Sequence, residues 1–274
     1  MGKLLAVDGD GSMTVPSGIR FEDVRVDFRH ADGRRMAALN GVDLQIPKGE
    51  FVCIVGKSGG GKSTLLRVLA GLIKPSSGVA RVDGAPVAGP SAERAMVFQE
   101  DTVFPWLRVQ DNVEFGLRAK GLPQKERAAQ AQAWLRSVGL VDVAGSWPKE
   151  LSGGMRKRVA LATVFATGAG ILIMDEPFGA LDFVTRATLH GVLLELWRQT
   201  RNTIVFVTHD IDEALILGDR ILVVSDGRIL DDIPCDLPRP RLEDERTSAR
   251  AVAITKTIVK HLGLAGEARP RQEP

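Results

Sequence analysis

The sequence predicts an α/β fold built on a mostly parallel, doubly wound sheet. Apolar runs of strand length alternate with longer segments of helical periodicity along most of the chain. A glycine-rich loop follows one such run, Phe51 to Val55, and an acidic pair follows another, Ile171 to Met174. Strands that alternate with helices form parallel sheets, and their functional loops gather at the carboxyl ends of the strands.

The composition is that of a globular protein with little net charge. The chain has 274 residues, with 36 Lys and Arg against 34 Asp and Glu, which gives a formal net charge of +2. This balance supplies no field that attracts nucleic acid, so we expect no nucleic-acid partner. The two cysteines show no disulfide framework, which favours a reducing, cytoplasmic setting. The sequence has no uncharged apolar run of about 18 residues, so we expect neither a membrane span nor an export signal.

The first part of the chain predicts a loose leader and a small antiparallel sheet. Residues 1–18 are rich in Gly, Asp and Ser and show no periodicity. Alternating apolar residues predict a strand from Ile19 to Phe28, followed by a turn at Ala31-Asp32-Gly33. Shorter apolar runs predict strands at Val42 to Ile46 and at Val79 to Val82.

A phosphate-binding loop is predicted between the strand Phe51 to Val55 and the helix Lys62 to Ala70. The loop, Gly56-Lys57-Ser58-Gly59-Gly60-Gly61-Lys62-Ser63-Thr64, fits the spacing G-x-x-x-x-G-K-[ST]. Its glycines let successive N–H groups point inward around phosphate oxygens, and the helix N-terminus faces the same anion. Lys62 is expected to reach the β- and γ-phosphates, and the Ser63 hydroxyl is expected to bind Mg²⁺.

The sequence predicts a helical region inserted between two halves of the α/β core, at about residues 100–160. A short apolar run, Ala95 to Phe98, predicts a buried strand that ends on Gln99. Apolar residues then recur at helical spacing, and Pro123 opens a helix over residues 124–138.

The second half of the chain returns to alternating strands and helices. Ser152 is placed to cap the next helix. The following elements are predicted in order: a strand at Ile171 to Met174, a helix at Asp182 to Arg201, a strand at Thr203 to Val207, a helix that ends at Leu217, and strands at Ile221 to Val224 and Arg228 to Ile233. The tail, residues 236–274, is predicted to contain one further short helix near Ser248 to Leu262, where Ala251, Ile254, Ile258 and Leu262 share a face.

Polar residues with catalytic chemistry follow several of these strands. Asp175 is placed to hold Mg²⁺ through its water shell, and Glu176 is placed to polarise an attacking water. Gln99 offers a neutral oxygen to Mg²⁺ or to that water, and His209 can donate to a γ-phosphate oxygen. Each residue alone fits a solvated loop or strand end, but together they converge on the edge where parallel-sheet active sites lie.

A second anion cradle is predicted at Ser152-Gly153-Gly154. The segment combines a hydroxyl group, two permissive backbone amides and a helix N-terminus. A capped helix start explains the same residues without a ligand. Because one domain needs only one phosphate cradle, the second suggests a site shared between two copies of the chain.

Six motifs in this order resemble the ATP-binding subunit of an ABC transporter. They span about residues 19–235 and are Gly56 to Thr64, Gln99, Leu151-Ser152-Gly153-Gly154-Met155, Ile171 to Glu176, Gly179-Ala180-Leu181-Asp182 and His209. The resemblance implies a P-loop NTPase (RecA-like) core with an antiparallel β-subdomain and an inserted α-helical subdomain. It also implies that the cofactors are ATP and Mg²⁺. Two copies would dimerise head to tail, with each ATP between one copy's glycine loop and the other copy's Ser152-Gly153-Gly154.

The resemblance assigns a role to each matching residue. Glu176 is the general base, His209 the γ-phosphate sensor, Gln99 the Mg²⁺ and water contact, and Asp182 the link across the dimer. Phe28 falls where the family places an adenine-stacking aromatic, and a core aromatic that ends a strand remains the alternative.

The sequence departs from the family pattern in one helix. Met155 and Lys157 stand where Gln is common, and Thr163-Val164-Phe165 replaces a usual Arg-Ala-Leu run. These departures concern the local packing of that helix and leave the hydrolytic residues intact.

A finer set of residues is similar to the ATPases of nitrate, sulfonate and taurine importers. The set is Phe98-Gln99-Glu100, Pro105-Trp106, Asn112-Val113, Asp175 to Asp182 and Leu237-Pro238-Arg239-Pro240-Arg241. Trp106 is either an apolar knob that receives a coupling helix from a membrane partner or a buried core side chain. The tail after Leu237 is either an accessory contact or a packed helix.

The resemblance implies an ATPase that powers import of a small anionic solute. Its partners would be a second copy, transmembrane permease subunits and, indirectly, a periplasmic or extracellular solute-binding protein, at the inner face of the cell membrane. The ATPase subunit of an exporter or of a lipid-trafficking system has the same ATP-hydrolysing domain and remains an alternative. A soluble non-transport ABC ATPase would bring coiled-coil arms, zinc cysteines or tandem domains, and a regulator with a degenerate site would lack Lys62, Asp175, Glu176 or His209. The sequence shows neither pattern.

Overall fold

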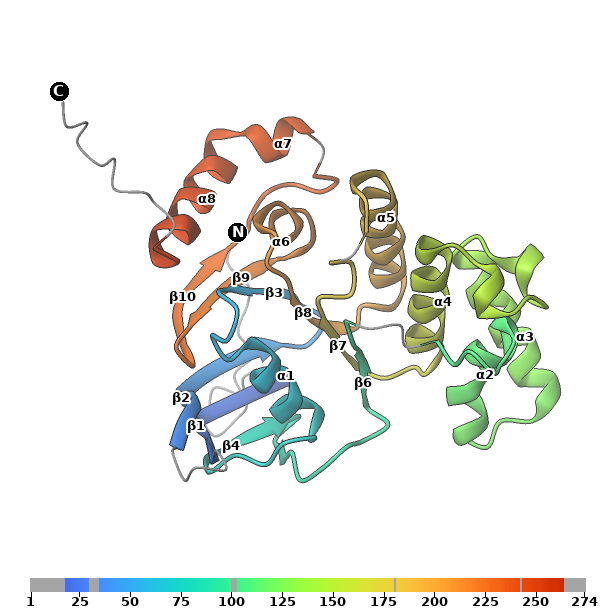
Figure 1. Ribbon diagram of the computed structural model, residues 1–274, viewed down its shortest axis with the longest axis horizontal. Helices are drawn as coiled ribbons and strands as arrows, with labels where there is room; N and C mark the ends of the chain where they lie inside the picture. The colour runs from blue at the N-terminus through green and yellow to red at the C-terminus, as the bar shows by residue number, and fades with distance from the viewer. Residues whose placement is uncertain (1–17, 30–34, 100–102, 180, 242, 264–274) are drawn as a thin grey trace, which may run out of the picture.

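The computed structural model describes residues 18–29, 35–99, 103–179, 181–241 and 243–263 (Figure 1). The predicted leader, apart from Gly18, and the predicted turn at Ala31 to Gly33 lie outside these residues, as do Glu100 and Ala180. Among the described helices, none is long and apolar enough to cross a membrane.

The smaller of two sheets is antiparallel, with strand order β2-β1-β4-β5. Its strands are β1 (Gly18–Arg29), β2 (Arg35–Pro47), β4 (Ser77–Val82) and β5 (Ala85–Pro86). Strand β2 begins well before the predicted Val42, because its pairing with β1 continues through register shifts around Val24. The predicted antiparallel sheet is confirmed.

The larger sheet has six strands in the order β10-β9-β3-β8-β7-β6. They are β3 (Phe51–Gly56), β6 (Arg94–Val97), β7 (Ile171–Asp175), β8 (Thr203–Val207), β9 (Arg220–Ser225) and β10 (Arg228–Pro234). All neighbours pair in parallel except β9 and β10, which are antiparallel. The predicted doubly wound α/β core is therefore confirmed.

The helices cover both faces of the larger sheet and extend to one side of it (Figure 1). They are α1 (Lys62–Ala70), α2 (Val109–Ala119), α3 (Gln124–Ser137), α4 (Gly153–Ala166), α5 (Phe183–Thr200), α6 (Ile211–Leu217), α7 (Glu243–Thr247) and α8 (Ala249–His261). Short 3₁₀ helices occupy Val141–Val143 and Pro148–Glu150. Helices α2 and α3 lie beyond α4, far from the small sheet, in the region predicted to be helical.

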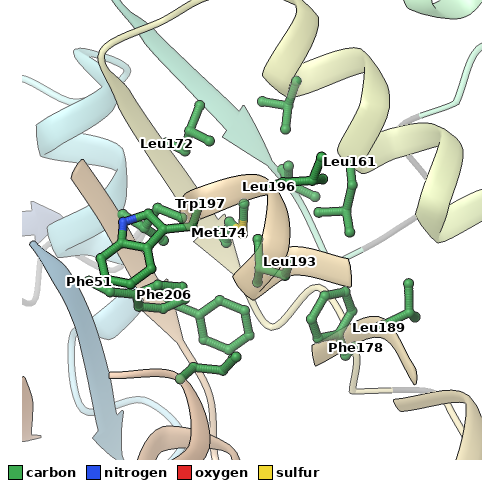
Figure 2. Packing of buried hydrophobic residues seen from close by; sticks show 14 of the residues in the cluster. Phe51, Leu161, Leu172, Met174, Phe178, Leu189, Leu193, Leu196, Trp197 and Phe206 are labelled. Atoms are coloured by element: carbon green, nitrogen blue, oxygen red, sulfur yellow. The ribbon is translucent and has the colours of Figure 1, made fainter. Parts of the chain in front are cut away.

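Strand β3 separates two apolar cores, because successive side chains of a strand point to opposite faces. Val52 and Ile54 join α1 and the small sheet in one core. Phe51, Cys53 and Val55 join the helices α2 to α6 and α8 in the other. Figure 2 shows part of this second core, where Phe51, Phe206 and Trp197 lie together. Burial on both faces fixes the parallel strands, and thereby the loops at their carboxyl ends.

The tail contains a packed helix, which is one of the two alternatives that the sequence left open. Ser248 caps α8 by accepting from the backbone N–H of Ala251 at 3.2 Å. The four apolar residues predicted to share a face are all buried: Ala251, Ile254, Ile258 and Leu262.

Candidate active site

The loop Gly56–Thr64 connects β3 to α1 and encloses the ammonium group of Lys62. Nζ of Lys62 donates to the carbonyl oxygens of Gly56 at 2.8 Å and Lys57 at 3.0 Å. Gly61 has a φ of 102°, and a Cβ atom there would lie 2.5 Å from a carbonyl oxygen of β2, so only glycine fits. Helix α1 has no side-chain cap and no acidic residue in its first turn. Its N-terminal amides are therefore suited to an anion.

Ser63 and Asp175 meet beside this loop. Oγ of Ser63, on α1, donates to Oδ1 of Asp175, at the end of β7, over 3.2 Å. Burial raises the pKa of Asp175, and this effect is larger than that of the hydrogen bond from Ser63, which lowers the pKa. Burial also lowers the pKa of Lys62, and this effect is larger than that of the nearby carboxylates of Glu176 and Asp175, which raise the pKa. Charged groups destabilised by burial are typical of a site that takes further charged ligands.

These oxygen donors suit a magnesium ion that is also held by phosphate and water. Mg²⁺ usually takes one or two protein carboxylates and completes its shell with substrate phosphates and water. Within the described ranges, no group of three or more His, Cys, Asp or Glu residues could hold a metal ion by itself. The hydroxyl of Ser63 and the carboxylate of Asp175 therefore fit a shared role with a nucleotide.

Gln99 follows β6, and its exposed side chain is not joined to the Ser63–Asp175 pair by a hydrogen bond within the described residues. Its backbone carbonyl instead accepts from Nζ of Lys157, on α4, at 3.1 Å. The structure thus ties the backbone of Gln99 to the helix that Ser152 caps.

Glu176 and His209 face one another across the ends of β7 and β8. Nδ1 of His209 lies 3.1 Å from Oε2 of Glu176. An ionised carboxylate only accepts, so Nδ1 is the donor in that state. Glu176 has a φ of 47°, unusual for a residue with a side chain, and its N–H donates to the carbonyl of Val207 at 3.0 Å. Backbone strain of this kind persists at functional sites because the surrounding contacts hold it.

Ser152 caps α4 as predicted, and it is exposed. Its Oγ accepts from the N–H of Met155 at 3.3 Å. A Cβ atom on Gly154 would lie 2.6 Å from Cγ2 of Thr185, so glycine permits the close approach of α4 to α5. In the part of the chain that the structure describes, no hydrogen bond joins Ser152, Gly153 or Gly154 to the loop Gly56–Thr64.

Asp182 caps α5, and Arg186 connects it to the strand end that carries His209. Oδ1 of Asp182 accepts from the N–H of Thr185 at 2.9 Å, and hydrogen bonding with the side chain and then the backbone of Thr185 lowers the pKa of Asp182. Arg186 donates to the carbonyl of Leu181 at 2.9 Å and to Oδ2 of Asp210 at 2.8 Å. No sequence pattern had indicated Arg186, because it acts between segments that are distant in the chain.

Phe28 lines a cavity of about 350 Å³ that also includes Lys62, Ser63 and Thr64. Its side chain is 37% exposed, so it is not a core aromatic. Asp226 and Gly227, in the β9–β10 turn, line the same cavity. The N–H of Gly227 donates to the carbonyl of Gly60 at 3.0 Å, a contact that the sequence did not indicate.

Trp106 is exposed, which removes the core interpretation. Its ring is 69% exposed and lies 5.5 Å from that of Phe104, which in turn lies 4.6 Å from Phe115. Asn112, buried on α2, holds the preceding loop. Its Oδ1 accepts from the N–H of Phe104 at 2.7 Å, and its Nδ2 donates to the carbonyls of Phe104, Leu107 and Arg108 at 3.2, 3.1 and 3.0 Å.

Comparison with known proteins places this geometry in a family. A sequence model described as ABC transporter matches residues 39–179. The chain is 47% identical over 205 residues to the nitrate import ATP-binding protein of Synechocystis sp., covering 74% of this chain and 77% of that protein. It is 45% identical over 241 residues to the taurine import ATP-binding protein of Sinorhizobium fredii, covering 87% of this chain and 90% of that protein. Among solved structures, the chain matches a dimeric ATP-binding cassette in a post-hydrolysis state, bound to ADP and Pi. The TM-score is 0.70 and the sequence identity is 30%, and the match covers 79% of this chain and 98% of the cassette chain.

Proposed function

Because the chain belongs to the ABC transporter family and is an ATPase of that family, we propose that it powers import of a small anionic solute through a separate permease. The proposal rests chiefly on the 42–47% identity to proteins named for import of nitrate, taurine and aliphatic sulfonates. The solute would be of one of these types. The site geometry supports the chemistry that drives this transport.

We infer that ATP binds with its phosphates in the loop Gly56–Thr64 and its base near Phe28. Lys62 and the loop amides would stabilise charge on the phosphates, in a partly buried site where such contacts are strong. The shared cavity supports a stacking role for Phe28. Bound Mg²⁺, held by Ser63, Asp175 and Gln99, would neutralise charge on the β- and γ-phosphates.

Hydrolysis proceeds by attack of water on the γ-phosphorus. Glu176 accepts a proton from the water as its oxygen bonds to phosphorus, and the bond from phosphorus to the β–γ bridging oxygen breaks. ADP leaves with that electron pair. His209, which shares a hydrogen bond with Glu176, orients the carboxylate and contacts the γ-phosphate.

Two copies complete each site. Ser152, Gly153 and Gly154 are exposed or half-buried at the start of α4, where their amides suit a phosphate. Within the described residues no hydrogen bond joins them to the loop of the same chain, which supports contact with the ATP of a second copy. Asp182 is placed to link the two copies, and the dimeric state of the solved relative supports this arrangement.

The aromatic patch of Phe104, Trp106 and Phe115 is the proposed contact for the permease. It follows Gln99 in the chain, so movement at the nucleotide reaches it over a short path. Large exposed aromatic side chains are typical anchors of protein interfaces. The protein would thereby lie at the inner face of the membrane, and a solute-binding protein would contact only the permease.

Uptake by a strain without this gene tests the proposed function. We expect loss of uptake of nitrate, taurine or an alkanesulfonate, restored by the wild-type gene but not by Lys62→Ala. Unchanged uptake of all three solutes, with the purified chain still hydrolysing ATP, would leave the ATPase intact and refute the proposed solute class.

A further inference from the structure

The start of α5 meets both segments through which the chain is proposed to contact a second copy. Asp182 caps this helix, and its Oδ1 accepts from the N–H of Thr185 at 2.9 Å. Thr185 also packs against the start of α4, since a Cβ atom on Gly154 would lie 2.6 Å from its Cγ2. A displacement of either segment in the dimer therefore reaches the start of α5, which carries Arg186.

Arg186 connects the start of α5 to the end of β8. Its Nη2 donates to the carbonyl of Leu181 at 2.9 Å, and its Nη1 donates to Oδ2 of Asp210 at 2.8 Å. Both side chains of this ion pair are partly buried, so solvent and salt screen it less than an exposed pair. A planar guanidinium holds two acceptors in a fixed geometry, which a lysine ammonium does not.

Asp210 is fixed from its other sides as well. Its Oδ1 accepts from two backbone N–H groups in the first turn of α6, at 2.9 and 3.2 Å. Its own N–H donates to Oγ1 of the buried Thr208 at 3.0 Å. His209 stands between these two residues, so the contacts of Asp210, including that with Arg186, hold the backbone on both sides of His209.

The contacts close into a ring that includes the proposed catalytic base. Nδ1 of His209 lies 3.1 Å from Oε2 of Glu176, and Leu181 follows Glu176 by five residues in the chain. The ring runs from Glu176 through Leu181, Arg186 and Asp210 to His209 and back. Removing the Arg186 guanidinium opens this ring at two hydrogen bonds.

We propose that Arg186 is a positioning residue for ATP hydrolysis, which aims His209 at the γ-phosphate and links this aim to the segment that meets the second copy. Arg186 does not line the cavity at Lys62, so it acts through Asp210. The inference rests on the proposed roles of His209 and Asp182. An alignment that serves the transition state should affect the rate of hydrolysis and leave the affinity for nucleotide unchanged.

Steady-state ATPase kinetics of the full chain test this role. We expect Arg186→Met to lower kcat about ten-fold, the size of one charge-assisted hydrogen bond. Its KM for ATP should stay within about two-fold, because the contacts of the phosphate loop are intact. Arg198→Met is the matched control, because Arg198 lies on the exposed side of the same helix and pairs with Glu195. The control should hydrolyse ATP at the wild-type rate.

Orthovanadate provides a readout that a purely structural role of Arg186 would not change. With Mg·ADP it mimics the phosphoryl group in transfer, so it reports contacts made in the transition state. Arg186→Met should weaken inhibition by vanadate about as much as it lowers kcat, while the affinity for ADP alone stays unchanged. Weaker binding of ADP together with unchanged inhibition by vanadate would overturn the proposal.

Asp210→Asn breaks the same contact from the other side. The asparagine oxygen can still cap α6, but its amide N–H groups then face Arg186. If the two residues act as one unit, the double variant Arg186→Met/Asp210→Asn loses no more rate than the slower single variant. Losses that multiply would show independent effects and overturn the proposal. Asp210→Asn leaves α5 unaltered, so the test stands even where Arg186→Met fails to fold.

Two further variants separate this inference from the proposals on which it rests. His209→Ala that hydrolyses ATP at the wild-type rate would remove the γ-phosphate contact, and the inference with it. If His209→Ala is slow but Arg186→Met and Asp210→Asn are as fast as Arg198→Met, only the role of Arg186 fails. In light scattering, Arg186→Met/Glu176→Gln should form the same ATP-dependent dimer as Glu176→Gln. Loss of that dimer would place Arg186 in dimer assembly and overturn its role in positioning His209.

Discussion

Replacing Asn112 with alanine should destabilise the loop that carries Trp106. The Asn112 side chain is 1% exposed and accepts one backbone hydrogen bond, while the two hydrogens of its Nδ2 are shared among three carbonyls. We therefore count about three hydrogen bonds, at about 1 kcal/mol each, and expect Asn112→Ala to lower the free energy of unfolding by about 3 kcal/mol. Urea denaturation measures this quantity directly.

Two variants sharpen this test. Gln110→Ala on the same helix removes side-chain bonds to Glu114 and Gln132 at a half-buried site, and should cost less than about 1 kcal/mol. Asn112→Asp keeps the acceptor for the Phe104 N–H but turns a carboxylate oxygen toward three carbonyls, so it should be no more stable than Asn112→Ala. A loss from Asn112→Ala no larger than that from Gln110→Ala would refute the reasoning.

Three further predictions concern the nucleotide site and the permease contact. Burial raises the pKa of Asp175, so the folded chain keeps the proton of this carboxyl group to higher pH than the unfolded chain. Without nucleotide, the free energy of unfolding should therefore fall as the pH rises from the ordinary pKa of 3.8 through the raised pKa. In thermal unfolding measured against pH, Asp175→Asn should lack this fall in stability. An unchanged slope would contradict the assignment. Ser152→Asp retains an oxygen that can cap α4 but places a negative charge where the phosphate of ATP should bind. This variant should fold normally but show no ATP-dependent dimer in light scattering. ATP-dependent dimerisation at the wild-type level would exclude the contact between Ser152 and phosphate. Trp106→Ala removes an exposed ring, so it should keep its basal ATPase rate within about two-fold but reduce solute uptake; undiminished uptake would remove Trp106 from the permease contact.

Local signals in the sequence were sufficient for elements with clear ends. Helix α1 spans the predicted Lys62–Ala70, because a glycine turn starts it and Gly71, in the left-handed region, ends it. Ser152 caps α4 as predicted, since a serine before an apolar helical pattern is a local signal, and Ser248 caps the tail helix α8 in the same way.

Features that depend on distant contacts could not be predicted. Trp106 had two interpretations because its exposure depends on how Asn112 folds the loop back. Arg241 belongs to a recognisable motif, yet its burial depends on carbonyls of Leu215 and Gly218, more than 20 residues earlier. Gly227 reaches the phosphate loop only because β9 pairs with β3. Each case depends on tertiary packing that no local pattern contains.

The most direct test of the catalytic account is phosphate release by Glu176→Gln, measured beside its ATP-dependent dimerisation. The amide keeps the size of the side chain but cannot take the proton of the attacking water. The account predicts that the variant binds Mg·ATP and forms a persistent dimer, while phosphate release falls about 100-fold or more. Turnover within a few-fold of the wild type would contradict Glu176 as the base and, with it, the proposed mechanism.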